Sequence, residues 1–276
     1  MGVVRAKQAT LPRLVALDPD GTLLRRDGSI SARTRRALGG VRARGLSLLF
    51  VTAEPPRRAR LFVEGRELSN VAICGDGSIV YDLLTDSVLE QRRLCGEHAT
   101  LLVESLRIAI PGVAFAVEVG SSYGCEHTYA IPRQHPRDRT DPLMRRGDAL
   151  ELCRGGVTKL SVQQEDWPLP ELWKMVSVFA STRAAVHYSR WNCIEITAPG
   201  VSKASALAAH CAARGIDPEQ VLAFGDRPSD LPMLRWAGDG IAVANAHPTV
   251  LAAADTVTRS TESDGVAIAL ESFGYA

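Results

Sequence analysis

Short apolar runs alternate with helical stretches at both ends of the chain, and this alternation constrains the fold more than any other feature. The stretches between the runs have helical spacing, and one begins at Ser31, a good N-cap residue. The recurring runs lie at residues 14–17 (LVAL), 46–51 (LSLLFV), 71–74, 221–224 and 241–243. Strands that are apolar at every position are typical of a parallel sheet covered by helices on both faces. The sequence therefore predicts an α/β fold with a Rossmann-like parallel sheet.

The middle of the chain has a different pattern. Helical stretches there mix with short strands, and a polar run rich in Pro and Arg lies at residues 132–146. This mixture is typical of an α+β domain. We therefore predict that residues 1–81 and 196–276 form the core domain and that residues 82–195 form an inserted α+β domain.

Composition excludes several classes of protein. The 276 residues carry a formal net charge of +1, which gives no general attraction to nucleic acid or to anionic lipid. The longest apolar run, residues 46–51, is too short to span a bilayer. The six cysteines are scattered without CxxC spacing, so we expect reduced thiols and a cytoplasmic location. The oligomeric state is left open.

Polar residues follow the predicted core strands. Because ligands of an open parallel sheet bind at the carboxyl ends of its strands, these residues are expected to meet at one edge. They are Asp18, Asp20, Thr52, Asp76, Asp226 and Asp230, with Lys203 near the start of a late helix. A cation in the first turn opposes the helix dipole, so a phosphate partner for Lys203 is favoured over a purely solvated role.

Carboxylates crowded together repel one another unless they share a cation. Hard carboxylate oxygens without His or Cys favour Mg²⁺. A hydroxyl and an ammonium beside them suit a phosphate group. Asp18 is then placed to attack phosphorus, and Asp20, two residues on, to protonate the leaving oxygen and later to deprotonate a water.

These motifs resemble the haloacid dehalogenase superfamily of phosphatases. The matching segments are DPDGTLL (18–24), Thr52 after an apolar strand, GVSK (200–203), FGDRPSDLPML (224–234) and DGVAIAL (264–270). The size and position of the insertion are similar to the Cof-type branch, subclass IIB, whose α+β cap lies between the second and third motifs. The resemblance covers essentially the whole chain, although the cap matches only in its placement.

The resemblance implies a role for each residue. Asp18 is the nucleophile and a Mg²⁺ ligand, and Asp20 is the general acid and base with its backbone carbonyl on the metal. Lys203 neutralises the phosphate and the nucleophile. The remaining assignments are Mg²⁺ binding for Asp226 and Asp230, phosphate binding for Thr52, and substrate binding for Asp76, where relatives often carry Asn.

Two departures from the family pattern concern the phosphate site. Pro19 stands where relatives carry an apolar residue whose N–H contacts the phosphate, and proline has no N–H to donate. After Thr52 relatives usually read Gly-Arg, whereas this chain reads Ala-Glu, with Glu54 in place of the cation. Arg57 or Arg58 is expected to replace the missing positive charge.

The sequence favours a Mg²⁺-dependent phosphatase that hydrolyses a small soluble phosphomonoester, with sugar phosphates as the first substrate class. Nucleotide or cofactor phosphates come next. The alternatives are a phosphotransferase or mutase of the same fold, and a phosphate-binding regulatory protein that has lost turnover. A dinucleotide-binding oxidoreductase is the weakest alternative, because no GxGxxG follows the first strand.

Overall fold

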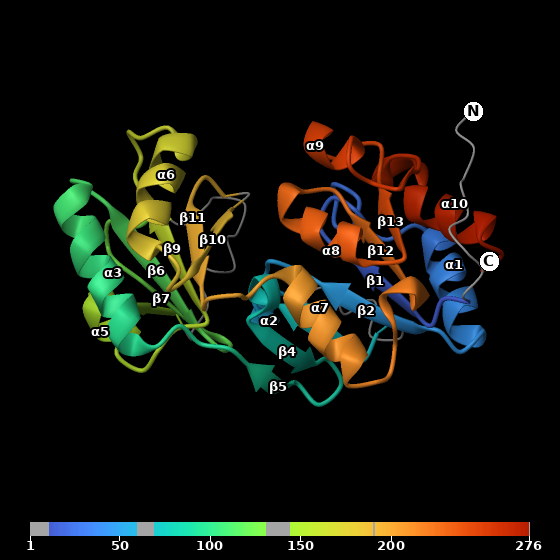
Figure 1. Ribbon diagram of the computed structural model, residues 1–276, viewed down its shortest axis with the longest axis horizontal. Helices are drawn as coiled ribbons and strands as arrows, with labels where there is room; N and C mark the ends of the chain where they lie inside the picture. The colour runs from blue at the N-terminus through green and yellow to red at the C-terminus, as the bar shows by residue number, and fades with distance from the viewer. Residues whose placement is uncertain (1–10, 60–68, 131–143, 190, 276) are drawn as a thin grey trace. The chain divides into compact units, whose positions relative to one another are not determined.

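The computed structural model describes residues 11–59, 69–130, 144–189 and 191–275 (Figure 1). It divides into two compact units, Met1–Leu89 with Ser202–Ala276, and Glu90–Val201. The first unit has a parallel-rich sheet between helices, and the second has a mostly antiparallel sheet with helices. The predicted α/β class with an inserted α+β domain is confirmed.

The first unit is built on an eight-stranded sheet in the order β14-β13-β12-β1-β2-β3-β4-β5. Strand β1 lies at its centre and pairs in parallel with β2 and β12. Its four side chains are fully buried, as expected for a strand that is apolar throughout. The strands are β1 (Leu14–Leu17), β2 (Ser47–Val51), β3 (Val71–Cys74), β4 (Ile79–Asp82), β5 (Ser87–Gln91), β12 (Val221–Gly225), β13 (Asp239–Ala242) and β14 (Thr256–Val257).

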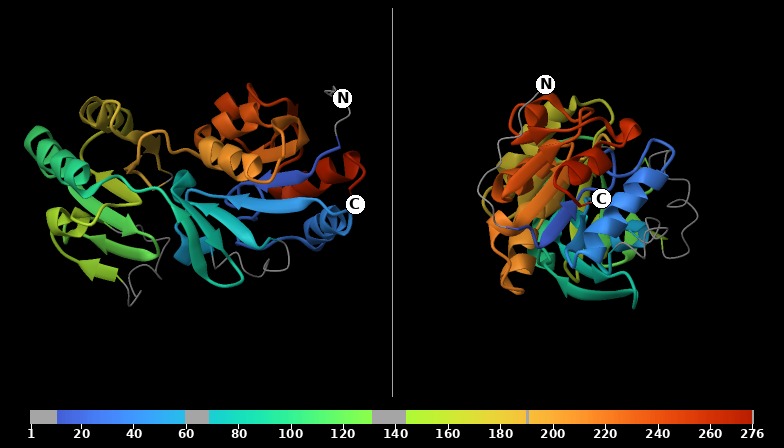
Figure 2. Two further views of the ribbon diagram at one scale, coloured as in Figure 1. Left: turned by 60° about the horizontal axis from the view of Figure 1, so that its bottom comes forward. Right: turned by 90° about the vertical axis from the view of Figure 1, so that its right-hand side faces the viewer.

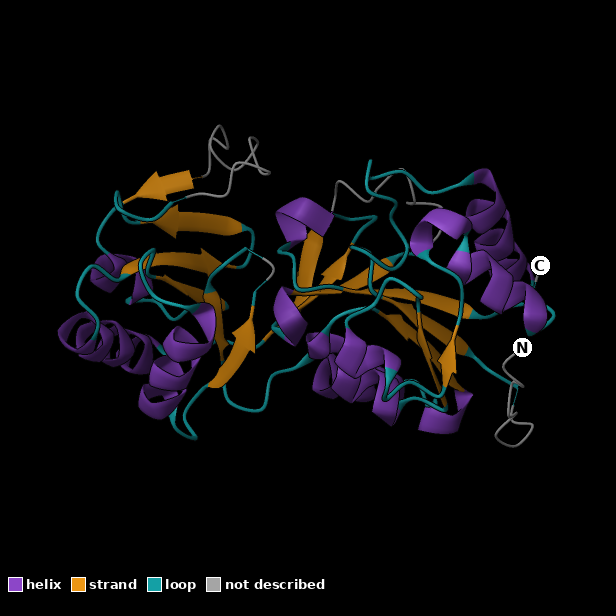
Figure 3. Ribbon diagram, turned by 90° about the horizontal axis from the view of Figure 1, so that it is seen from above, coloured by secondary structure: helices purple, strands orange, loops and turns teal. Residues whose placement is uncertain are grey.

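Helices cover both faces of this sheet (Figure 3). The α-helices are α1 (Ala32–Ala43), α2 (Pro56–Ala59), α7 (Lys203–Ala212), α8 (Leu231–Trp236), α9 (Pro248–Leu251) and α10 (Gly265–Ser272). Short 3₁₀ helices lie at Gly75–Gly77, Pro218–Gln220, Pro228–Asp230 and Thr261–Ser263. Helix α1 begins as predicted, because the Ser31 side chain accepts a hydrogen bond from the backbone N–H of Thr34. Helices α1 and α10 pack together although they lie near opposite ends of the chain (Figure 2).

The second unit has a six-stranded sheet in the order β10-β11-β9-β6-β7-β8. Helices cover one face of this sheet (Figure 3), and its apolar core includes Phe115, Leu160 and Ile194. The strands are β6 (Ala114–Val119), β7 (Ser122–Cys125), β8 (Met144–Arg146), β9 (Lys159–Gln163), β10 (Ala185–Tyr188) and β11 (Ile194–Thr197). The helices are α3 (Gly96–Ala109), α5 (Ala149–Cys153) and α6 (Leu169–Ala180).

The unit boundaries differ from the predicted ones, 81/82 and 195/196. The first predicted boundary cuts β4, and the core sheet continues through β5. The second cuts β11, which pairs with β10 and β9 in the other sheet. Strand β5 is exposed at every position, so it carries no hydrophobic pattern by which the sequence could place it.

Three further expectations concern membrane spans, cysteines and one helix. In the part that the structure describes, no helix combines the length and apolar character needed to cross a membrane. The six cysteines, all among the described residues, form no disulfide with one another. Of the helix expected around residues 57–68, only α2 lies within the described residues.

Candidate active site

Parallel register brings the candidate residues to one edge of the core sheet. Leu17 of β1 pairs with Phe50 of β2 on one side and with Phe224 of β12 on the other. Asp18, Thr52 and Asp226 follow these paired positions by one or two residues. They therefore lie at the carboxyl ends of adjacent strands, where ligands of such sheets bind.

Three buried carboxylates gather at this edge. Asp18, Asp226 and Asp230 are at most 6% exposed, and each offers an oxygen within 4.8 Å of the others. The Lys203 ammonium is 2% exposed. It donates hydrogen bonds of 2.6 Å to Asp18 Oδ1 and to Asp230 Oδ1. Residues separated by 185 positions in the sequence thus form one charged cluster.

The charges of the cluster do not balance. Burial raises the pKa of Asp18 well above its usual value, and Asp230 and Asp226 raise it further against the opposing effect of Lys203. Burial and repulsion from Asp230 raise the pKa of Asp226 to about 6. Asp18 and Asp230 raise the pKa of Lys203 despite its burial, so the lysine stays protonated. Three carboxylates face one buried ammonium, and the partly exposed Arg227 guanidinium reaches only Asp226, at 3.6 Å. A divalent cation would neutralise the negative charge that remains, and all-oxygen donors suit Mg²⁺.

Close backbone contact positions Lys203 and Asp76. The Ser202 side chain accepts a hydrogen bond from the Ser205 N–H and so starts α7. A Cβ on Gly77 would lie 2.3 Å from the Ser202 carbonyl oxygen, so only glycine allows the 75–77 turn to pack against this helix. Asp76 is buried in the left-handed region at φ 55° and helps to raise the pKa of Lys203. The turn thus places a further carboxylate near the ammonium.

Asp230 ties the loop after β12 together. Its Oδ2 accepts hydrogen bonds from the backbone N–H groups of Asp226 and Arg227, at 3.0 and 2.9 Å. A Cβ on Gly225 would lie 2.6 Å from the Asp230 Cβ, so the loop closes tightly only over glycine. Asp230 therefore orients Asp226 and Lys203 in addition to offering an oxygen of its own.

The loop after β1 is held by the carbonyl of Pro19, which accepts hydrogen bonds from the N–H groups of Leu23 and Leu24. Within it Asp20 is half-buried, and its carboxylate is not part of the three-carboxylate cluster. Thr22, which the sequence analysis did not single out, donates a 3.1 Å hydrogen bond from Oγ1 to Asp226 Oδ1. A hydroxyl residue directly after the Asp20-Gly21 turn is the sequence signal for this contact.

The segment after β2 carries Thr52 and Glu54, the acid that stands where relatives usually have Arg. Thr52 is buried and its Oγ1 accepts a 3.0 Å hydrogen bond from the Glu54 N–H, which leaves the Thr52 O–H as a donor. Glu54 forms a 3.0 Å ion pair with Arg58, which satisfies the acid locally. Arg57 is half-buried on α2, one residue before this partner.

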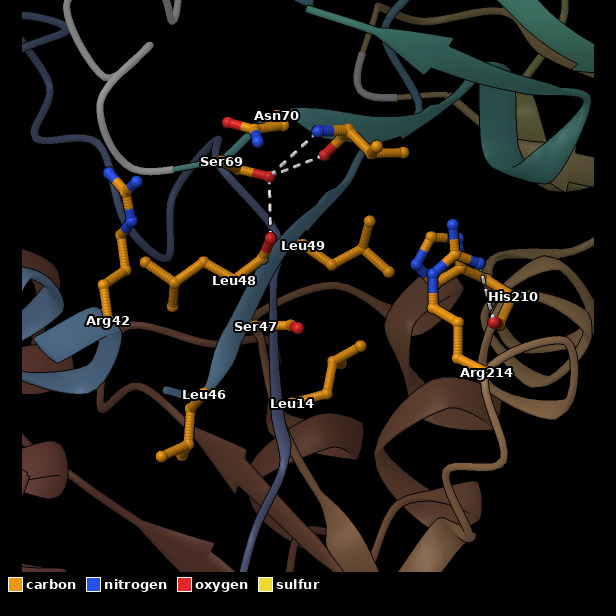
Figure 4. Close-up of a pocket in the computed structure, with 11 residues that line it drawn as sticks. Leu14, Arg42, Leu46, Ser47, Leu48, Leu49, Ser69, Asn70, His210 and Arg214 are labelled. Atoms are coloured by element: carbon orange, nitrogen blue, oxygen red, sulfur yellow. Dashed lines mark hydrogen bonds between the residues drawn. The ribbon is translucent and has the colours of Figure 1, made fainter. Parts of the chain in front are cut away.

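A hollow of about 190 Å³ lies at the opposite edge of the same sheet, at the amino ends of β1, β2 and β3 (Figure 4). Its lining includes Arg42, Arg214, Ser47 and His210, and no residue of the acidic cluster. Figure 4 shows Arg214, two residues past the end of α7, beside His210 of that helix, and Arg214 Nη1 donates a 3.0 Å hydrogen bond to the His210 carbonyl. This hollow is therefore separate from the candidate site.

His210 makes the stability of the protein depend on pH. Burial, together with Arg214, lowers its pKa from 6.5 to about 4, so the unfolded chain binds more protons than the folded one between these values. Stability is therefore lost as the pH falls below about 6.5. Because the ring is only half-buried, we expect a modest loss of about 1 kcal/mol at about pH 5. Urea unfolding at about pH 7 and pH 5 should show His210→Gln losing less stability than the wild type, and equal losses would contradict this.

Comparisons with known proteins agree with the geometry. A family model described as haloacid dehalogenase-like hydrolase matches residues 15–270. The 5-amino-6-(5-phospho-D-ribitylamino)uracil phosphatase YitU of Bacillus subtilis (strain 168) is 27% identical, over 96% of this chain and 98% of its own. The pyridoxal phosphate phosphatase YbhA of Escherichia coli (strain K12) is 29% identical, over 92% and 96%. A solved HAD-superfamily phosphatase from Bacteroides thetaiotaomicron shares the fold with a TM-score of 0.82 at 22% identity, covering 96% of each chain.

Proposed function

Since the chain belongs to the haloacid dehalogenase-like hydrolase family and is a phosphatase of that family, we propose that it hydrolyses a small soluble phosphomonoester through a phospho-aspartyl intermediate on Asp18, with Mg²⁺ as cofactor. The observation that carries this proposal is the buried cluster in which Lys203 joins Asp18 to Asp230, within reach of Asp226. A purely structural core does not gain stability from three like charges buried together, so the cluster favours a ligand-binding or reactive site.

The proposed mechanism assigns each step to a residue of the cluster or of the adjoining loop. An Asp18 carboxylate oxygen attacks phosphorus, the bond to the ester oxygen breaks, and Asp20 gives its proton to that oxygen. Asp20 then takes a proton from a water that attacks the phosphorus, which frees phosphate and restores Asp18. Lys203 holds the reacting oxygen of Asp18, and the Thr52 O–H donates to the phosphate. Mg²⁺ bound by Asp18, Asp226 and Asp230 would screen the negative charges of the carboxylates and the phosphate.

For the substrate we propose sugar phosphates first, with cofactor phosphates as the second class. The first choice rests on the family resemblance, and the second is supported by the names of the two relatives, which hydrolyse a phosphoribitylamino-uracil and pyridoxal phosphate. A cytoplasmic setting suits both classes. Net charge near neutrality favours small-molecule substrates over nucleic acid.

A phosphate-release screen tests the proposal. Sugar, nucleotide and cofactor phosphates are incubated with the full chain, with and without Mg²⁺. We expect release on at least one class only with Mg²⁺, and none from Asp18→Asn. Metal and phosphate binding without release on any class would favour the regulatory alternative, and transfer to an added sugar rather than to water would favour the phosphotransferase.

Pro19 is expected to slow this enzyme, and Pro19→Leu should raise its rate. The loop is closed by the Pro19 carbonyl, not by an N–H of residue 19, so leucine preserves the turn and adds the missing donor. One hydrogen bond to a charged group contributes about 1.5–3 kcal/mol, which corresponds to a gain of about 10- to 100-fold in kcat/KM. Steady-state kinetics on the best substrate of the screen measures it. An unchanged or lower rate would show that the N–H of residue 19 does not limit turnover.

A further inference from the structure

One loop that carries none of the predicted ligands is hydrogen-bonded to both segments that do. It follows β13 and contains Asn245 and His247. The Asn245 side-chain Nδ2 donates a 2.7 Å hydrogen bond to the carbonyl of Gly21, in the loop after β1. The backbone N–H of His247 donates a 2.8 Å hydrogen bond to the carbonyl of Asp226, in the loop after β12. This loop therefore helps to fix the loop after β1 and the loop after β12 relative to each other.

Thr261 completes the attachment. Its Oγ1 donates a 2.5 Å hydrogen bond to the same Gly21 carbonyl, and its N–H donates a 2.8 Å hydrogen bond to Asn245 Oδ1. Thr261 is buried, whereas Asn245 is exposed. Gly21 O thus receives two donors, and the buried threonine also orients the asparagine that supplies the other one.

The position of Gly21 decides how much room the Asp226 carboxylate has. Gly21 has φ +85°, and a Cβ built on it would lie 2.5 Å from Asp226 Oδ2. The next residue, Thr22, donates its hydroxyl hydrogen to Asp226 Oδ1. A shift of Gly21 would therefore move both the backbone that packs against the Asp226 carboxylate and the hydroxyl that donates to it.

Two other contacts join the C-terminal segment to the loop after β1, and they are weaker candidates for a positioning role. The Arg25–Asp264 ion pair, at 2.8 Å, is partly exposed, and Glu262 accepts a hydrogen bond from the exposed Arg26 N–H. Exposed ion pairs contribute little because water screens them. The pair formed by Asn245 and Thr261 differs because both of its donors reach the Gly21 carbonyl itself.

We infer that Asn245 and Thr261 are positioning residues: they hold the Gly21 carbonyl so that Gly21 and Thr22 orient the Asp226 carboxylate for a divalent cation. This inference rests on the proposed function, because it concerns the same metal site. Neither residue touches the reacting atoms, so both act through Asp226.

Calorimetric titration of the full chain with MgCl₂, without substrate, tests the inference. Loss of one hydrogen bond from the support of Gly21 in Thr261→Val is expected to raise the Kd for Mg²⁺ about five- to tenfold. Asn245→Ala, at an exposed position where folding is not at risk, is expected to raise it by a similar factor. Kinetics should show a matching rise in the Mg²⁺ concentration for half-maximal rate. At saturating Mg²⁺ the KM for the phosphate ester should stay within about twofold.

Two control variants separate positioning from general loss of structure. Thr261→Ser keeps the hydroxyl and should bind Mg²⁺ as the wild type does. Thr258→Val removes a comparable 2.8 Å hydrogen bond, from Thr258 Oγ1 to the Gly265 carbonyl, without contact with Gly21, and should also leave the Kd unchanged. The inference would be overturned if both Thr261→Val and Asn245→Ala bound Mg²⁺ with the wild-type Kd, or if Thr258→Val raised the Kd as much as they do. Phosphate release by the wild type would show that the proposed function still holds in that case. A wild-type chain that neither binds Mg²⁺ nor releases phosphate would overturn the proposed function and the inference together.

Discussion

Asp18→Asn is expected to abolish phosphate release, lowering kcat by about 10⁴-fold or more. The amide oxygen of asparagine is a poor nucleophile, and the variant cannot form the phospho-aspartyl intermediate. The amide still accepts a hydrogen bond from Lys203, so the cluster should keep its arrangement. Phosphate release on the best substrate of the screen, at saturating Mg²⁺, measures the loss.

The same substitution should stabilise the protein in the absence of metal. Asp18 is buried beside Asp226 and Asp230, and its raised pKa shows that its charge is unfavourable there. Removing one of three like charges relieves this repulsion, while Lys203 keeps its ion pair with Asp230, so we expect a gain of about 1–2 kcal/mol. Urea unfolding in EDTA measures the gain, and Mg²⁺ should stabilise the variant less than it stabilises the wild type.

Asp27→Asn is the matched control for both effects. Asp27 is exposed in the same loop, where its carboxylate accepts a hydrogen bond from the Ser29 N–H, away from the buried cluster. This variant should keep its activity and its unfolding free energy. If Asp18→Asn retained measurable turnover above the level of a buffer blank, another residue would have to be the nucleophile.

The sequence could predict the carboxylate cluster because its aspartates lie at or just after the ends of parallel strands. Parallel strands bring their carboxyl ends to one edge wherever they occur in the sequence, so an acid directly after an apolar run can be placed without knowing the full topology. Asp18, Asp226 and Asp230 gather in this way, and Lys203 joins them from the start of a helix. Apolar runs predicted the buried strands for the same reason, since burial on both faces leaves a signal at every position.

The remaining features depend on contacts that leave no periodic signal. Strand β5 is exposed and β8 is polar, so hydrophobic pattern could not identify either one. Glu54 follows its threonine as an isolated acid in the sequence, and its pairing with Arg58 depends on the turn into α2. Asn245 and Thr261 are ordinary loop residues until the fold brings them to a carbonyl more than 200 positions away. Such side chains act through backbone atoms, whose neighbours are set by tertiary structure alone.

Lys203→Met should affect stability as well as catalysis, because it removes the only ammonium that contacts the carboxylate cluster in the described residues. The methionine side chain has a similar length but no charge. Three buried carboxylates would then lack a buried counter-ion, since Arg227, 3.6 Å from Asp226 Oδ2, is half exposed to solvent. Removing one partner of a buried ion pair typically costs about 3–5 kcal/mol. Activity should fall by about 10³-fold, since neither the nucleophile nor the phosphate is then neutralised.

Mg²⁺ separates this electrostatic explanation from simple loss of packing. If the cost arises from excess negative charge, Mg²⁺ should restore stability to Lys203→Met by more than it adds to the wild type, because the cation meets a larger uncompensated charge. Lys174→Met, at an exposed position of α6, removes the same charge from the chain without touching the cluster, and it should unfold as the wild type does with or without Mg²⁺. Unfolding free energies of Lys203→Met that are low but insensitive to Mg²⁺ would mean that the lysine serves packing rather than charge balance. The proposal of a cation site at this cluster would then be wrong, because uncompensated negative charge would not be what destabilises the variant.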